Sequence, residues 1–258
     1  MSAGAEPLRL EPLEGGAVWR VTLATPRANI LDREKTERLG AIFARARQTR
    51  ELKAIVIDAD GPNFSFGASV EEHLPAQVEP MIRGFHELFH RMLDASVATL
   101  AAVRGQCLGG GLELAAFAQR VFAAPDVRLG QPEIQLGVFA PVASVALVER
   151  VGRGAAEDLC LSGRSIGAEE AARIGLVDEI AADPSAAALA WAREHLLPKS
   201  ASSLRFALRA ARLGFAERFR RELAEVERIY LGELMGSTDA REGLQAFLDK
   251  RRPRWSDA

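Results

Sequence analysis

The chain has 258 residues, of which 48% are hydrophobic and 26% are charged, and its formal net charge is −2. This composition is ordinary for a globular protein with a sizeable core, and the small net charge argues against a general nucleic-acid or membrane-surface binder. The two cysteines, Cys107 and Cys160, lie far apart without a metal-like spacing, which fits a reducing compartment. The sequence contains neither a stretch of membrane-spanning length nor a signal-peptide core, so we expect a cytoplasmic protein.

Short apolar segments alternate with helical patterns through the first two thirds of the chain. Two such segments flank Glu14-Gly15-Gly16-Ala17 and predict a hairpin, while Asp32 predicts the start of a helix. In chain order we expect strands over 8–13, 18–24, 53–59, 98–103, 120–124, 127–129 and 176–180, and helices over 32–50, 79–93, 112–117, 142–151, 155–161 and 168–174. From about Ser185 onward the pattern is entirely helical. This helical tail is too small to form a hydrophobic core of its own, so we expect it to pack on a neighbouring part of the chain or on a sister subunit.

The stretch RGQCLGGGLE, residues 104–113, lies between a predicted buried strand and a predicted helix. Its three glycines allow positive φ angles and let a ligand approach the backbone closely. The helix start points free N–H groups and the positive end of the helix dipole at that place, which suits a developing oxyanion. Glu113 stands one turn inside this apolar helix, where a carboxylate is either paired or functional because burying it alone is costly.

Two groups of residues could carry chemistry. Glu113 and Glu133, the latter in a proline-flanked turn, could serve as base and acid if their pKa values differ; the alternative is two ordinary surface glutamates. The backbone N–H groups of Ala68 and Gly110 each follow a glycine in a tight turn and could together hold an enolate or tetrahedral oxygen. Taken alone, this second pair is equally typical of two ordinary strand-to-helix turns.

A third pattern, His86-Glu87-Leu88-Phe89-His90, matches the H-E-x-x-H motif of zinc hydrolases. Glu113 lies far enough downstream to be a third ligand. Against zinc, the same helix already carries an apolar face, and the match needs only three residues. The remaining candidates have plainer interpretations: His73 is expected on a helix surface, and Cys107 is expected as a small core residue.

Four strings in a fixed order carry a resemblance: AAVRGQCLGGGLELA, RLGQPEIQLGV, LSGRSIGAEEAARIGLVDEI and STDAREGLQAFLDKRRP. Together they resemble the crotonase (enoyl-CoA hydratase/isomerase) superfamily over nearly the whole chain. The resemblance implies an α/β fold, a crotonase-type spiral of ββα units over 1–190, followed by a C-terminal helical oligomerisation segment over 191–258. It also implies a homotrimer, or a homohexamer formed by two stacked trimers.

The resemblance also assigns site residues. It places the oxyanion hole at Ala68 and Gly110 and the two hydratase glutamates at Glu113 and Glu133. It places coenzyme A (CoA) along the turn at 26–29, which includes Pro26, and the loop at 65–70. The expected contacts with the CoA ester are Arg27, Ala28, Ser65, Phe66, Ser69, Val70, Phe139 and Pro141. The implied hydration needs neither a metal nor another cofactor, because the CoA thioester is part of the substrate.

Two segments depart from the usual hydratase pattern. Gly67-Ala68-Ser69 stands where Gly-Ala-Asp is usual, and residues 137–144 replace a glycine-rich segment. Both variants resemble the dienoyl-CoA hydratases of anaerobic benzoyl-CoA degradation, which implies 1,4-addition of water to cyclohexa-1,5-diene-1-carbonyl-CoA, giving 6-hydroxycyclohex-1-ene-1-carbonyl-CoA. We hypothesise that Phe139, Pro141 and Val142 shape the pocket wall for a flat ring.

Three other functions remain open from the sequence. The nearest alternative is a generic short-chain enoyl-CoA hydratase. More distant alternatives are a zinc-dependent hydrolase that uses His86 and His90, and an inactive scaffold that binds CoA esters. The retained pair of glutamates argues against the inactive scaffold.

Overall fold

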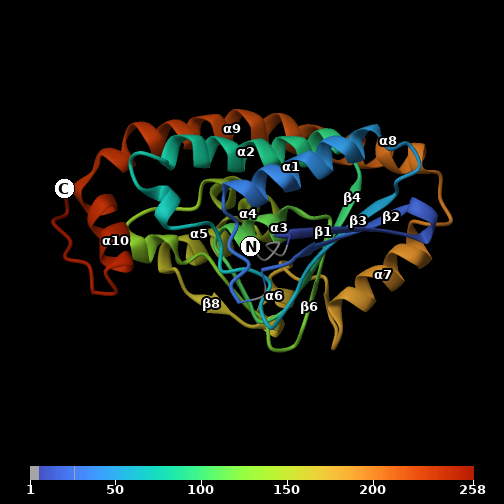
Figure 1. Cartoon of the computed structure of the whole chain (residues 1–258), viewed down its shortest axis with the longest axis horizontal. Coiled ribbons are helices and arrows are strands. Elements are labelled where there is room, and N and C mark those ends of the chain that lie inside the picture. The colour runs from blue at the N-terminus through green and yellow to red at the C-terminus, as the bar shows by residue number, and fades with distance from the viewer. Residues whose placement is uncertain (1–5, 26) are drawn as a thin grey trace, which may run out of the picture.

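The main sheet contains six strands in the order β1-β2-β3-β4-β6-β9 (Figure 1). The computed structural model describes residues 6–25 and 27–258. Only the hairpin pair β1 and β2 is antiparallel, and each of the other neighbouring pairs is parallel. The strands are β1 (Leu8–Leu13), β2 (Val18–Leu23), β3 (Ala54–Ala59), β4 (Ala98–Val103), β6 (Arg120–Ala123) and β9 (Glu179–Ile180).

A second, smaller sheet contains β5 (Gln106–Leu108), β7 (Arg128–Gly130) and β8 (Ser165–Ile166). Strand β5 follows β4 after only two residues, and the glycine turn follows β5 directly. The polypeptide thus leaves the large sheet, enters the small sheet and turns into a helix within a few residues. An isolated bridge from Ser65 to Cys107 ties the loop after β3 to the same small sheet.

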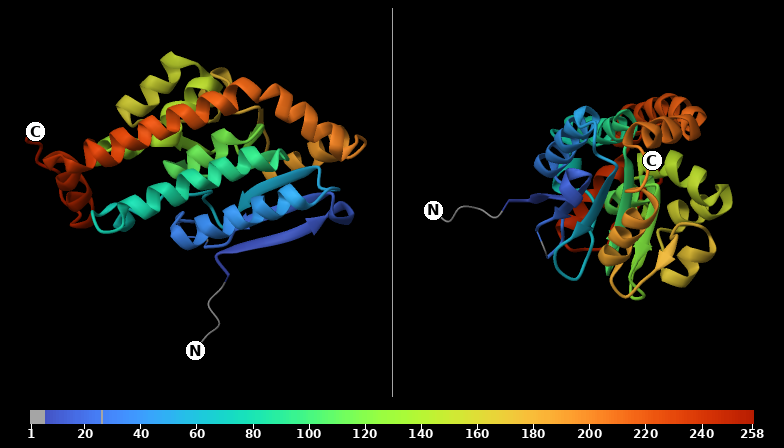
Figure 2. Two further views of the ribbon diagram at one scale, coloured as in Figure 1. Left: turned by 90° about the horizontal axis from the view of Figure 1, so that it is seen from above. Right: turned by 90° about the vertical axis from the view of Figure 1, so that its right-hand side faces the viewer.

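Three long helices run side by side over one face of the main sheet: α1, α2 and α9 (Figures 1 and 2). Helix α7 packs on the opposite face, against β3, β4 and β6. The helices are α1 (Arg33–Gln48), α2 (Val78–Ala95), α3 (Gly110–Phe117), α4 (Pro141–Val151), α5 (Arg153–Ser162), α6 (Ala168–Arg173), α7 (Pro184–His195), α8 (Ala201–Ala211), α9 (Leu213–Gly232) and α10 (Thr238–Leu248), with short 3₁₀ helices η1 (Glu14–Gly16), η2 (Glu71–His73), η3 (Pro132–Leu136) and η4 (Leu234–Gly236).

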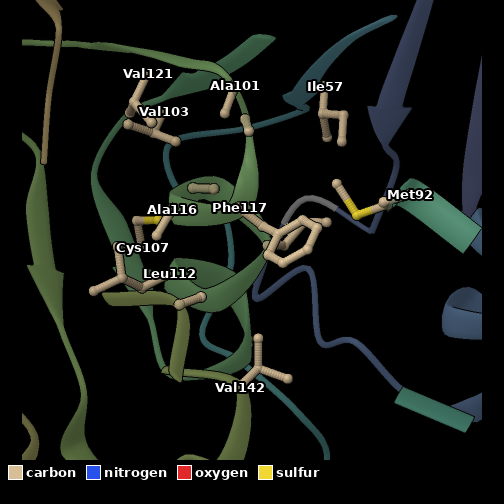
Figure 3. Close-up of a cluster of buried hydrophobic side chains, with 14 of the residues drawn as sticks. Ile57, Met92, Ala101, Val103, Cys107, Leu112, Ala116, Phe117, Val121 and Val142 are labelled. Carbon is tan, nitrogen blue, oxygen red and sulfur yellow. The ribbon is translucent and has the colours of Figure 1, made fainter. Parts of the chain in front are cut away.

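The alternation of side chains along β3 divides the interior into two layers. Ile55 and Ile57 point into the main core, whereas Ala54 and Val56 belong to a separate cluster that includes Ala188 of α7. This is the period of two expected of a strand that is covered on both faces. Figure 3 shows how α3 lies inside the main core, with Leu112, Ala116 and Phe117 among the surrounding strand residues.

The C-terminal helices pack on their own chain. Helix α9 contacts both α2 and α4 and buries Phe219, Leu223 and Tyr230. Helix α10 packs on η3, where Gly243 touches the carbonyl oxygen of Leu136 so closely that a Cβ atom would overlap it. The expectation that the tail covers a neighbouring part of the chain is therefore met within one subunit. The division at residue 190 and the oligomer stay predictions.

The predicted α/β class is confirmed, and each predicted strand and helix has a counterpart, but the sequence analysis does not predict strands β5 and β8, and three other elements differ locally. Helix α3 begins at Gly110 rather than at Leu112, because the second and third glycines already adopt helical geometry. Residues 132–136 form a 3₁₀ helix rather than an open turn, and β9 has only two residues. None of the helices in residues 6–25 and 27–258 is long and apolar enough to cross a bilayer.

Candidate active site

The three consecutive glycines after β5 differ in what each allows. Gly109 has a φ of 52°, and a Cβ atom there would overlap the carboxylate of Glu133. A Cβ atom on Gly110 would lie 3.2 Å from the amide nitrogen of Ala68, and one on Gly111 would lie 2.6 Å from the Cβ of Ser65. The absence of a side chain thus lets Gly109 lie against Glu133, and lets Gly110 and Gly111 lie against Ala68 and Ser65 of the loop at 65–70.

The facing loop is held on both sides by backbone hydrogen bonds. The Phe66 amide donates to the Ala28 carbonyl at 2.9 Å, and the Gly67 carbonyl accepts from the Leu31 amide at 2.9 Å. On the other side, the Leu108 amide donates to the Ser65 carbonyl at 2.9 Å. The loop is therefore fixed between the 27–31 segment and the small sheet.

This arrangement brings the amides of Ala68 and Gly110 to the same place. Gly67, with a φ of 97°, turns the chain so that a Cβ atom on it would lie 3.2 Å from the Gly110 nitrogen. Neither amide donates a hydrogen bond to an acceptor in the described part of the chain. Both border one cavity, and Gly110 opens helix α3. Two free donors and a helix N-terminus at one point form a site suited to a developing oxyanion.

Glu113 is 3% exposed and lies in the wall of this cavity. Its Oε1 atom accepts a hydrogen bond of 2.8 Å from the Ala143 amide, in the first turn of α4. Burial raises the pKa of Glu113, while the amides of Ala143 and Val142 act in the opposite direction by stabilising the carboxylate. The N-terminus of α4 therefore favours the ionised form of an otherwise desolvated acid.

Glu133 borders the same cavity from η3, but it has different surroundings. Its Oε2 atom is buried without a hydrogen-bond partner in the described structure. Burial raises the pKa of Glu133, and the negative charge of Glu113 raises it further. Burial thus raises both pKa values, but two amides of α4 oppose the rise at Glu113, whereas the charge of Glu113 adds to it at Glu133. The two carboxyl groups therefore differ in acidity, as a base and an acid must.

An apolar wall closes the rest of the cavity. Four of the residues that the resemblance assigns to the site line it: Phe66, Val70, Phe139 and Pro141. It is also lined by side chains that the sequence analysis does not assign to the site: His73, Met81, Ile82, Phe85, Leu136, Val138 and Leu244. Val142 packs in the main core, and its backbone faces Glu113. The missed residues come from η2, α2, η3, the segment after η3, and α10, and local patterns do not place α2 or α10 near the glycine turn.

The expectation for His73 is met only in part. His73 lies on the 3₁₀ helix η2 and is partly exposed, but it also borders the cavity. Its Nδ1 atom is 2.7 Å from the Ser69 carbonyl oxygen, so Nδ1–H donates and Nε2 is left as an acceptor. Burial lowers the pKa of the imidazole, which favours this neutral form. The spacing of Ser69 and His73 was the available sequence signal.

The H-E-x-x-H motif does not form a metal site. His86 is buried with its Nδ1 2.7 Å from Glu227 of α9, and His90 lies beside Arg220. Glu113 is engaged with α4 instead. Over residues 6–25 and 27–258, no group of three or more His, Cys, Asp or Glu side chains is placed to hold a metal ion. The two histidines thus serve the packing of α2 on α9.

Comparison with known families bears directly on this geometry. A family model described as enoyl-CoA hydratase/isomerase matches residues 14–258. The chain belongs to the enoyl-CoA hydratase/isomerase family. The family match covers both amide-bearing loops, both glutamates and the C-terminal helices.

Individual members of the enoyl-CoA hydratase/isomerase family support this assignment. A cyclohexa-1,5-dienecarbonyl-CoA hydratase of Thauera aromatica is 51% identical over 257 residues, covering 100% of both chains. A probable enoyl-CoA hydratase of Bacillus subtilis is 32% identical and covers 91% of this chain and 93% of its own. The crystal structure of an enoyl-CoA hydratase/isomerase from Xanthobacter autotrophicus superposes with a TM-score of 0.82 at 27% identity, covering 95% of this chain and 97% of that one.

The residues expected to contact CoA in this family member fall into two groups. Arg27 is exposed and Ala28 holds the oxyanion loop, whereas Pro26 lies outside the described residues. Ser65 is fully buried, with its hydroxyl donating to the Asn29 carbonyl and accepting from the Gly67 amide. Ser69 hydrogen-bonds Glu71. Ser65 is therefore placed to shape the loop from behind, and the cavity itself is bordered by Phe66 and Val70.

Proposed function

We propose that this family member hydrates cyclohexa-1,5-diene-1-carbonyl-CoA to 6-hydroxycyclohex-1-ene-1-carbonyl-CoA. The observation that carries the proposal is the convergence of two free amides and two unlike buried carboxyl groups on one apolar cavity. The identity of 51% with the Thauera hydratase supports the cyclic dienoyl substrate. A cytoplasmic location, and a place in anaerobic degradation of aromatic compounds, remain predictions from the sequence.

In the proposed reaction, the thioester oxygen lies between the amides of Ala68 and Gly110. Water attacks the β carbon of the ring while Glu113, stabilised as a carboxylate by α4, removes its proton. The electron pair of the broken double bond passes to the thioester oxygen and forms a dienolate. The two amides stabilise the charge that develops there, which is where hydrogen bonds lower the barrier most.

Protonation completes the addition. Glu133, whose pKa is raised by burial and by the charge of Glu113, holds the proton that is delivered to the far end of the dienolate. The double bond that remains is conjugated to the thioester. A second proton transfer restores the starting state, either directly from Glu113 to Glu133 or by loss of the Glu113 proton to solvent and uptake of a solvent proton by Glu133. No group besides the two carboxyls and the two amides is required.

The wall suits a ring better than a flexible chain. Phe85 and Phe139 present aromatic surface to the cavity, and Met81, Ile82 and Leu244 close its apolar end. The contacts with CoA that we propose are Arg27, Ala28, Phe66, Ser69 and Val70, with Ser65 supporting their loop. We also propose a homotrimer or homohexamer, since Leu161, Phe206 and Leu213 expose 73%, 66% and 68% of their surface.

The test compares substrates side by side. Purified protein is incubated with cyclohexa-1,5-diene-1-carbonyl-CoA and with crotonyl-CoA, and kcat/KM is measured for each. We expect a clear preference for the cyclic diene, and product made in D₂O should carry deuterium at the far end of the former dienolate. Faster turnover of crotonyl-CoA would favour a generic hydratase. Binding of both esters without turnover of either would favour an inactive scaffold.

A further inference from the structure

The chain contains a single tyrosine, and its hydroxyl group has no assigned partner. Tyr230 lies on α9 and is 0% exposed. Its hydroxyl makes no hydrogen bond to another group in residues 6–25 and 27–258. A buried hydroxyl without a partner costs folding free energy, and phenylalanine would fill the same space without that cost. Packing alone therefore gives no reason for a tyrosine here.

Tyr230 stands directly behind the acyl end of the cavity. It belongs to one cluster with Met81, Ile82, Val138 and Leu244, and these four side chains also line the cavity. The ring of Phe139 meets the Tyr230 ring edge-on, with a centroid separation of 5.1 Å, as aromatic pairs prefer. The hydroxyl is thus one layer away from where the substrate ring would lie.

A second orphaned polar atom lies in the same region. The Oε2 atom of Glu133 is buried without a partner, like the Tyr230 hydroxyl. Burial raises the pKa of the Tyr230 hydroxyl, and the negative charges of Glu133 and Glu113 raise it further. A tyrosine hydroxyl is a donor, and a carboxylate oxygen is an acceptor. The two unsatisfied atoms are therefore chemically complementary.

We propose that Tyr230 is a positioning residue for Glu133: its hydroxyl donates a hydrogen bond, directly or through one water molecule, to Oε2 of the ionised carboxylate. Such a bond is longer or absent before substrate binds and forms as Glu133 gives up its proton. It stabilises the carboxylate at the step where negative charge appears on it. This inference rests on the proposed hydration, in which Glu133 is the acid.

The other groups facing Glu133 do not replace this donor. Glu113 of α3 can only accept hydrogen bonds when ionised, and its charge opposes ionisation of Glu133. His73 of η2 already uses its Nδ1–H on the Ser69 carbonyl. Cys160 of α5, whose pKa is raised by burial and by both glutamates, is a weak donor. Tyr230 is the strong uncommitted donor among these four groups.

The test replaces the hydroxyl alone. In Tyr230→Phe we expect kcat to fall about tenfold, the size of one hydrogen bond to a charged group, while Tm stays equal or rises because an orphaned hydroxyl is gone. Loss of a donor to the carboxylate raises the pKa of Glu133, so the alkaline limb of the pH–kcat profile should move to higher pH. Titration of ¹³C-labelled glutamate by NMR, assigned with Glu133→Gln, should show the same shift.

Phe219→Leu is the matched control. Phe219 is a buried aromatic residue of the same helix but belongs to the main core. We expect this variant to lower Tm and to leave both the alkaline limb and the carboxyl titration in place. An unshifted limb and an unshifted titration in Tyr230→Phe would overturn the inference. A wild-type protein without hydratase activity would instead count against the proposed function, and the carboxyl titration would still report on the Tyr230 contact.

Discussion

The two sides of the cavity are built in different ways. On the oxyanion side, the groups that face the substrate are backbone amides, held by the ladder that joins Phe66 to Ala28 and Leu108 to Ser65. On the opposite side, the groups are side chains such as Met81, Phe139 and Leu244, which come from three separate helical segments or their flanks. In the proposed function, the first side binds the thioester oxygen of any substrate, whereas the second side selects the shape of the acyl group. The proposal therefore assigns reaction type and substrate choice to different parts of the chain.

The largest effect is expected where both sides meet, at the two carboxyl groups. Glu113→Gln and Glu133→Gln keep the shape of the side chain but remove the ability to move a proton. Each should lower kcat for the cyclic diene by about 10²–10⁴, the usual loss on removing a general acid or base. The measurement is steady-state kinetics on each variant, after its Tm has been found equal to that of the wild-type protein. Full activity in either variant would remove that glutamate from the mechanism.

A smaller loss of kcat should follow from a substitution that shifts the loop on the oxyanion side. Gly67→Ala places a Cβ atom 3.0 Å from the Leu108 carbonyl at a φ of 97°, so the loop that carries the Ala68 amide must shift. We expect kcat to fall about 10²-fold, near the loss of one oxyanion donor, for cyclic and linear substrates alike. Gly15→Ala is the control, since it also has a positive φ, 65°, but has open space around its Cβ and lies on the surface. Equal activity losses in the two variants would indicate general destabilisation instead.

The smallest change should follow from altering the side-chain wall. If residues 138–144 select the ring, replacing Val138, Phe139 and Ala140 by a glycine-rich sequence, with Pro141–Ala143 kept to hold Glu113, should raise crotonyl-CoA turnover relative to the cyclic diene. A change of about tenfold in that ratio is typical of one altered apolar contact. Val148→Ala, on the exposed side of α4, should leave the ratio unchanged. An unaltered ratio in the wall variant would place selectivity elsewhere.

The same contrast explains what the sequence could predict. Local sequence patterns predict the oxyanion side: glycines before a helix, an apolar strand, and Asp32 as a helix cap. The side chain of Asp32 accepts a hydrogen bond of 2.8 Å from the Lys35 amide. These features single out Ala68, Gly110, Glu113 and Glu133 as candidates, and the resemblance to the family is what assigns their roles. The structure shows Glu133 on a 3₁₀ helix rather than in an open turn.

The wall could not be predicted in this way. Leu244 reaches the cavity from a helix more than one hundred residues after Glu133, and nothing in its own neighbourhood distinguishes it from any amphipathic position. His73 differs from Leu244, because its contact with the Ser69 carbonyl is local and the spacing of the two residues is its only sequence signal. For Leu244, long-range packing decides the position, and local patterns carry no record of it.

The docking of α10 on η3 also orders events during protein synthesis. Every group proposed to take part in proton transfer has left the ribosome once Glu133 has emerged, but Leu244 is still to be translated. Until then the acyl end of the cavity is open to water, and the contact between Gly243 and the Leu136 carbonyl has not formed. A nascent chain therefore carries the carboxyl pair before Leu244, which lines the same cavity, has been made.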